Sequence, residues 1–142
     1  MADDTTDSEI RRIFAEAKVV ALIGASPDPA RVSNRIGNFL VRQGYRVIPV
    51  NPVAAGQEIF GETVVGSLAE APEADFLDVF RRSKFVPDIV DEALEVMPAL
   101  KTVWMQLGVR SESAATKASQ HGITAVQDRC PAIEIPRLGI TR

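Results

Sequence analysis

Apolar residues along this chain follow two alternating patterns. Five short runs rich in Val, Ile, Leu and Phe predict buried strands over 18–23, 45–50, 76–80, 102–106 and 123–126. Stretches with apolar residues at helical spacing predict four helices, which begin near Ser8, at Ser33 or Asn34, at Val86 and near Ser111. Between the second and third strands we expect only an extended piece at 64–65 and one helical turn around Leu68.

The ends of the first two helices have candidate capping residues. A Ser8 side chain suits the N-cap of the first helix, and Ser33 or Asn34 suits that of the second, because these short polar side chains accept from free backbone N–H groups. Gly44 is expected to end the second helix in the left-handed conformation. The strand over 123–126 is the last predicted element.

Strands that alternate with helices predict an α/β protein with a mainly parallel sheet and helices on both faces. We therefore expect a single Rossmann-like domain over residues 1–142, with a polar N-terminal tail at 1–7. A chain of 142 residues is long enough to bury a core without disulfides or metals.

Ligands of such sheets bind beyond the carboxyl ends of the strands. Four segments follow successive predicted strands, so they are expected to share one edge and line one cleft: Gly24–Ser26, Asn51–Pro52, Phe80–Ser83 and Gln106–Gly108. The cleft is the predicted functional site.

The first of these segments resembles a nucleotide-binding turn. Gly24 ends an apolar strand just before a helix, where backbone N–H groups and a helix N-terminus would face a phosphate. Ser26 stands where the dinucleotide pattern G-x-G-x-x-G has its second glycine, and its hydroxyl could donate to a phosphate. The alternative is a turn with only a structural role.

The end of the second strand limits the nucleotides that fit. NAD sites place Asp or Glu there to accept from the ribose hydroxyls, whereas this chain has Asn51 followed by Pro52. The absence of an acid argues against NAD and is compatible with a phosphorylated ribose, as in NADP or coenzyme A.

Arginines supply candidate countercharges. Arg31 and Arg35 lie in the first loop and at the start of its helix, where a bound phosphate would interact with them. Arg81 and Arg82 follow the third strand and are expected to project over the cleft, with surface ion pairing as the alternative. Arg42, near the far end of the helix, is assigned to the solvated surface.

Composition narrows the classes of function. The chain has 16 Lys and Arg against 19 Asp and Glu, which gives no general basic surface for nucleic acid. The single cysteine excludes an internal disulfide, and no apolar run is long enough for a bilayer. The acidic N-terminus is unlike a targeting peptide, so a cytoplasmic location is expected. No metal-ligand spacing and no Ser–His–Asp arrangement is present.

Several motifs occur together in order. They are Gly24-Ala25-Ser26-Pro27-Asp28-Pro29-Ala30-Arg31, Gly44-Tyr45, Val47-Ile48-Pro49-Val50-Asn51-Pro52, Asp78-Val79-Phe80-Arg81-Arg82-Ser83, Val103-Trp104-Met105-Gln106-Leu107-Gly108-Val109 and Asp128-Arg129-Cys130. From about residue 11 to residue 138 the chain resembles the small bacterial CoA-binding proteins of the YccU-like family, whose fold is that of the N-terminal domain of the succinyl-CoA synthetase α-subunit. Pro131 after Cys130 departs from the family's pattern.

The resemblance implies coenzyme A as the ligand. By position it implies three groups of binding residues: Gly24, Ala25, Ser26 and Arg31 for the diphosphate, Val50, Asn51 and Pro52 for the adenosine, and Phe80, Arg81 and Ser83 for the third loop. We expect binding of CoA or a short acyl-CoA without catalytic activity of the chain's own.

Three other functions stay open. The chain could be a subunit of an acyl-CoA synthetase with a separate protein partner, an NADP-dependent oxidoreductase, or a scaffold in which the cleft is vestigial. Cys130 could form a mixed disulfide with the CoA thiol, or it could simply be a buried small apolar residue.

Overall fold

A five-stranded parallel sheet lies at the centre of the computed structural model, which describes residues 5–141. The strands are β1 (Val19–Ile23), β2 (Arg46–Val50), β5 (Phe76–Val79), β6 (Thr102–Met105) and β7 (Thr124–Val126), in the order β2-β1-β5-β6-β7. The chain moves outward from β1 to β2 and then returns to the other side of β1 as β5. The carboxyl ends of β1 and β5 are therefore the switch point at which such sheets bind ligands.

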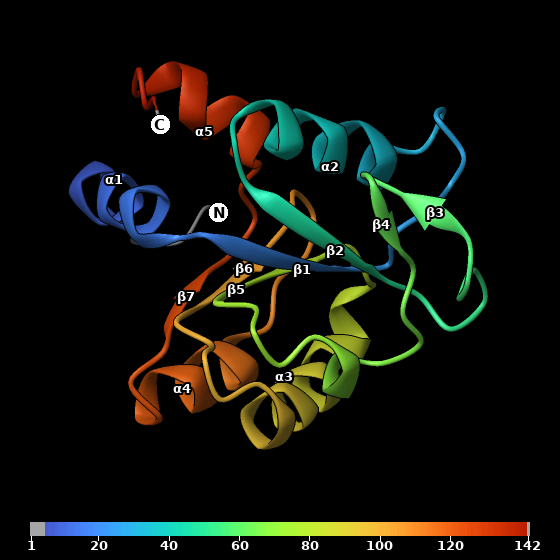
Figure 1. Ribbon diagram of the computed structural model, residues 1–142. Coiled ribbons are helices and arrows are strands. Elements are labelled where there is room, and N and C mark those ends of the chain that lie inside the picture. Colours follow the sequence, from blue (N-terminus) through green and yellow to red (C-terminus); the bar gives the residue numbers. More distant parts are fainter. Residues whose placement is uncertain (1–4, 142) are drawn as a thin grey trace.

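Helices cover both faces of the sheet, as Figure 1 shows. Three helices lie on one face: α1 (Asp7–Glu16), α2 (Val32–Arg42) and α5 (Pro131–Arg137). Two helices lie on the other: α3 (Val86–Val96) and α4 (Glu112–Gln120). Each face has its own buried hydrophobic cluster, one around Phe14, Phe76 and Trp104 and one around Leu77, Val90 and Met105. The predicted α/β Rossmann-like architecture is confirmed.

Both predicted N-caps are wrong. Helix α1 begins one residue before Ser8, and its cap is Thr6, whose hydroxyl accepts from the Glu9 N–H at 3.1 Å. Helix α2 begins at Val32, so Ser33 and Asn34 lie buried in its first turn. The prediction of Gly44 as the end of α2 is confirmed, since Gly44 has φ +100° directly after the C-cap.

The section between β2 and β5 contains a hairpin that the sequence reasoning did not predict. Strands β3 (Glu58–Ile59) and β4 (Glu62–Thr63) pair antiparallel around Phe60 and Gly61, both of which have positive φ. The Phe60 ring lies so close to Gly37 of α2 that a Cβ there would be 2.1 Å from it. Two short 3-10 helices, η1 (Leu68–Glu70) and η2 (Ser83–Phe85), complete the loops. The hairpin thereby packs against the helix that follows the first turn.

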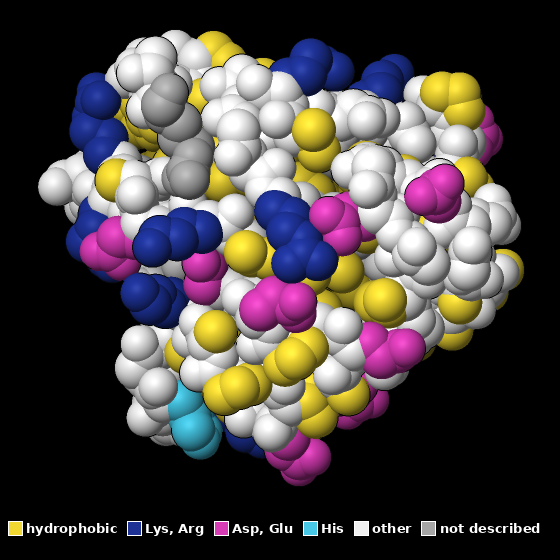
Figure 2. All heavy atoms as spheres, in the orientation of Figure 1, with side chains coloured by type: hydrophobic (Ala, Val, Ile, Leu, Met, Phe, Trp, Pro, Cys, Tyr) yellow, Lys and Arg dark blue, Asp and Glu magenta, His cyan; other side chains and the backbone are white. Residues whose placement is uncertain are grey.

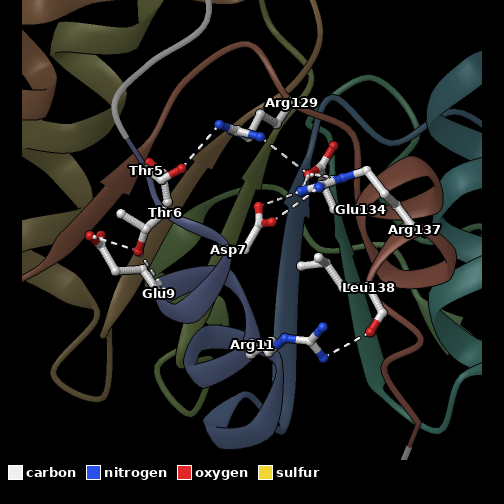
Figure 3. Close-up of polar contacts among 9 residues, drawn as sticks. All are labelled: Thr5, Thr6, Asp7, Glu9, Arg11, Arg129, Glu134, Arg137 and Leu138. Carbon is white, nitrogen blue, oxygen red and sulfur yellow. Dashed lines mark hydrogen bonds and ion pairs between the residues drawn. The ribbon is translucent and has the colours of Figure 1, made fainter.

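The two ends of the described chain are joined by a polar cluster between α1 and α5, drawn in Figure 3. The Arg137 guanidinium donates to Asp7 at 2.8 Å and to the buried Glu134 at 2.7 Å. Arg129 also donates to Glu134, at 3.2 Å, and to the Thr5 carbonyl, at 3.1 Å. This network fixes the path of the C-terminal segment after Cys130.

Candidate functional site

Two adjoining depressions lie at the carboxyl edge of the sheet and share Gly24 and Asn51. The first has a volume of about 560 Å³ and is lined by Gly24, Ala25, Ser26, Ala30, Arg31, Val32, Ser33, Asn51 and Phe80. The second, of about 210 Å³, is lined by Ile23, Gly24, Val50, Asn51, Pro52, Gly66, Ser67, Leu68, Arg81, Ile89 and Glu92. Together they form a cleft at the switch point between β1 and β5.

The turn after β1 depends on glycine for two reasons. Gly24 has φ +90°, which side chains disfavour, and a Cβ on it would lie 2.3 Å from the Phe80 carbonyl oxygen. The Gly24 N–H donates to the Val50 carbonyl of β2 at 3.0 Å. Three strand ends therefore converge on this residue, and their approach forms the floor of the cleft.

Two asparagine side chains fix the rest of the turn. The Asn51 amide donates to the Ala25 carbonyl at 2.7 Å, and its oxygen accepts from the Val53 N–H at 2.9 Å. The Asn34 amide donates to the Ser26 carbonyl at 2.9 Å. Asn34 thus holds the loop that precedes its helix and does not cap it. Asn51, at the position where NAD sites carry an acid, is committed to the backbone.

The N-terminus of α2 forms one wall of the first depression. Its N-cap residue is Arg31, which makes no side-chain capping bond, and the first turn contains no acidic residue. The first backbone N–H groups of a helix have no partner within the helix, and the helix dipole places partial positive charge there. The Arg31 side chain is exposed beside them. This wall suits an anion.

The second depression also contains a positioned cation. Arg81 lines it, and its guanidinium carbon lies 4.6 Å from the centre of the Phe85 ring. A guanidinium over an aromatic face is attracted to the ring, which favours one orientation of a long side chain. The other charged residue of this lining is Glu92 on α3.

Nine of the ten predicted binding residues line the cleft. The first depression brings together Gly24, Ala25, Ser26, Arg31, Asn51 and Phe80, and the second adds Val50, Pro52 and Arg81. Ser83 lines neither. Its hydroxyl accepts from the Arg110 N–H at 2.9 Å and approaches the Gly108 carbonyl at 3.5 Å, so it joins two neighbouring loops.

Several lining residues were not predicted. Ala30 lines the first depression from the loop before α2, and Val32 and Ser33 line it because α2 begins earlier than its sequence suggested. The residues from η1 and α3, including Leu68, Ile89 and Glu92, reach the second depression from elements whose packing the sequence does not specify. If the sequence analysis had predicted the start of this helix at Val32, Val32 and Ser33 would have been expected to line the cleft.

Cys130 and His121 lie outside both linings. Cys130 is only 5% exposed, at the N-cap position of α5, and belongs to the hydrophobic cluster on that face. The structure therefore favours its interpretation as a buried apolar residue. His121 ends α4, with its Nδ1 2.9 Å from the Lys117 carbonyl.

Charge on the surface is mixed. On the face in Figure 2, Lys and Arg side chains lie among Asp and Glu side chains and do not merge into one basic area. Between residues 5 and 141 no helix is both long and apolar enough to span a membrane.

Fold and cleft together define a Rossmann-like domain with an anion-compatible turn at its switch point. The chain belongs to the CoA-binding domain family, whose model matches residues 18–136.

Known relatives agree with this assignment. The uncharacterized protein YneT of Bacillus subtilis is 34% identical over 124 residues, which cover 87% of this chain and 89% of YneT. A solved structure of a Thermus thermophilus protein, cell-free ID.343, is 38% identical with a TM-score of 0.87, covering 94% of this chain and 99% of that one. The α-subunit of an ADP-forming acetate–CoA ligase from Pyrococcus furiosus is 33% identical over 100 residues, or 64% of this chain and 22% of the subunit.

Proposed function

We propose that this chain binds coenzyme A, or a short acyl-CoA, across the two depressions. The observation that carries the proposal is the composition of the first depression, in which a glycine turn, an uncapped helix N-terminus and Arg31 face one space. The diphosphate would lie there, because free N–H groups and a guanidinium both favour it. Membership of the CoA-binding domain family supports this choice of ligand.

The adenosine would extend toward Asn51 and Pro52. The second depression has apolar walls from Val50, Leu68 and Ile89 that suit a base. No carboxylate follows β2 at Asn51, so the end of this strand does not repel a ribose phosphate, and the one carboxylate of the lining is Glu92 on α3. Arg81 supplies a cation in the same depression. This arrangement supports a nucleotide with a phosphorylated ribose, which CoA is.

The chain is proposed to bind its ligand without catalysing a reaction alone. A second candidate function is the CoA-binding part of an acyl-CoA synthetase, which the similarity to the acetate–CoA ligase α-subunit favours. The match covers only 22% of that subunit, so this function also needs the chemistry of the rest of the subunit, which this second candidate assigns to a protein partner. ATP-dependent thioester formation by the chain together with a co-purified partner would support the second function.

Calorimetric titration of CoA into wild type and two arginine variants tests the proposal. Arg31→Ala should weaken binding by about 1.5–3 kcal/mol, because it removes a charge-assisted contact to phosphate. Arg42→Ala is the matched control: it removes an exposed arginine from the other end of the same helix, outside both linings. Equal affinity of all three proteins would contradict the assigned diphosphate position. Tighter binding of NADP than of CoA would support the oxidoreductase alternative.

A further inference from the structure

A carboxyl group without a partner lies inside the sheet. Asp78 of β5 has no exposed surface, and neither of its carboxyl oxygens has a hydrogen-bond partner among the described residues. Its neighbours in register are Leu22 on β1 and Trp104 on β6. An ionised carboxylate in such a place would be strongly unfavourable, because burial removes it from bulk solvent and no cation among the described residues bonds to it.

A second buried polar atom without a hydrogen-bond partner belongs to the residue that follows the neighbouring strand β6. Gln106 follows β6 directly, two residues beyond Trp104, and its side-chain Oε1 is buried without a partner. Residues two apart in a strand point to the same face, so Asp78 and Gln106 are diagonal neighbours on one side of the sheet. The Gln106 Oε1 atom accepts no hydrogen bond, and a protonated Asp78 carboxyl group has an O–H that can donate one.

Asp78 also lies directly beneath the cleft. Leu22 precedes Gly24 by two residues and Asp78 precedes Phe80 by two, and both Gly24 and Phe80 line the first depression. Two residues of a strand span about 7 Å. A negative charge on Asp78 would therefore lie within about 10 Å of an anion in that depression, inside protein that screens it poorly.

We propose that Asp78 is a positioning residue that keeps its proton in the native protein, donates it in a hydrogen bond to Gln106 Oε1, and so leaves the floor of the anion site uncharged. Loss of this proton then lowers both the stability of the native fold and its affinity for an anion. The part of the proposal that concerns the anion rests on the proposed function. The part that concerns the proton does not.

Burial is the cause of the shift in this group. The pKa of Asp78 is raised well above its ordinary value of 3.8, with desolvation as the cause and no contribution from a charged side chain. In the neighbouring C-terminal segment, Cys130 is buried, and Arg129, Glu134 and Arg137 are bonded within the polar cluster of Figure 3. Asp128 accepts from the Gly108 N–H and from the Arg110 guanidinium. Asp78 is therefore expected to titrate independently of them.

The sign of the pH dependence follows from the raised pKa. Above pH 3.8 the unfolded chain releases this proton, whereas the native protein retains it up to its own higher pKa. Rising pH then lowers the folding equilibrium constant by up to about tenfold per pH unit relative to a variant without the proton. Asp78→Asn is that variant, since its amide also donates a hydrogen bond and carries no charge.

The first experiment uses the protein without ligand. Urea unfolding of wild type and Asp78→Asn is measured between about pH 5 and pH 9, and the advantage of the variant should grow with pH. A constant difference between the two proteins overturns the proposal. If Asp78→Asn does not fold, the infrared spectrum of wild type at neutral pH decides: a protonated carboxyl band is expected, and its absence contradicts the proposal.

The second experiment adds CoA. Once the pH passes the native pKa of Asp78, marked by the loss of its infrared carboxyl band, the dissociation constant for wild type should rise up to about tenfold more than for Asp78→Asn. Only wild type then gains a charge under the anion. If the dissociation constants of the two proteins change equally with pH, the proton on Asp78 does not affect anion binding, and this part of the proposal is overturned. If CoA binds neither protein at any pH, the proposed function fails and the link falls with it, while the unfolding experiment still decides the protonation of Asp78.

Discussion

The Phe80 carbonyl oxygen lies 2.3 Å from the position that a Cβ on Gly24 would occupy. Real Cβ atoms do not approach an oxygen so closely. The ends of β1 and β5 can therefore lie this near each other only because residue 24 is a glycine. The same contact forms the floor of the first depression, which both residues line. A glycine is needed at the first turn because of this approach between two strands, quite apart from any ligand.

Gly24→Ala should therefore lower the free energy of unfolding by about 2–4 kcal/mol, through backbone strain at φ +90° and the clash with Phe80. Gly56→Ala is a matched control, since Gly56 has φ +92° but no atom within 4 Å of its Cβ position. The control should lose only about 1 kcal/mol. Chemical unfolding measures both, and equal losses would contradict the steric role of Phe80.

Val32→Glu should separate the stability of α2 from its anion binding. Val32 is 51% exposed at the first position of α2 and lines the first depression. An acid at a helix N-terminus stabilises by about 0.3–1 kcal/mol, so the melting temperature should be unchanged or slightly higher. The same charge should weaken CoA binding about tenfold or more. Val32→Gln, without the charge, is the control, and equal affinities of the two variants would exclude an anion at this wall.

Cys130 should resist modification in the native protein. Only 5% of the residue is exposed, and it packs in the cluster beneath α1, α2 and α5. Incubation with CoA disulfide followed by intact-mass measurement should give no adduct, whereas the unfolded chain should react with a thiol reagent. A CoA-sized adduct on the folded protein would show that the thiol reaches the ligand.

The ion pair between Asp7 and Arg137 should contribute less as the solution becomes acidic. The hydrogen bond from Arg137 lowers the pKa of Asp7, so its contribution is present above the ordinary value of 3.8 and lost as pH falls through the native value. Asp7→Asn should therefore lower the melting temperature at neutral pH and have little effect at low pH. Glu95→Gln, an exposed change on α3, is the control. A loss for Asp7→Asn that is equal at all pH values would contradict this account.

The sequence predicts the sheet and its helices because their signals are strong and local. Apolar runs mark every central strand, and the order of strands and helices allows few topologies. The starts of α3 and α4 were predicted correctly, whereas those of α1 and α2 were not. Both Thr6 and Ser8 can cap a helix, and the choice depends on where the first turn packs. Asn34 has a capping side chain but uses it on the Ser26 carbonyl.

The elements that were missed are those stabilised by tertiary contacts. The hairpin at Phe60 consists of two-residue strands held by packing against Gly37 of α2. Helix α5 is only seven residues long, and its Arg137 is bonded to Asp7 of α1, at the other end of the described chain. One signal for α5 was present, since Pro131 occupies the first helical position, where proline is common.

The predicted site residues come together because the carboxyl ends of parallel strands share one edge. This rule places Gly24, Asn51 and Phe80 in one cleft from the sequence alone. The same rule was wrong for Gln106–Gly108, which line neither depression. It cannot tell which side chains turn inward to bind other loops. Ser83 follows the same strand as Phe80, yet its hydroxyl is bonded to the loop at Arg110.

Native mass spectrometry of the purified chain with equimolar CoA, NAD and NADP tests the central claim most directly. The account predicts that the chain acquires, or already carries, one CoA and binds the two dinucleotides more weakly. Preferential binding of NADP, or no binding of any of the three, would contradict it.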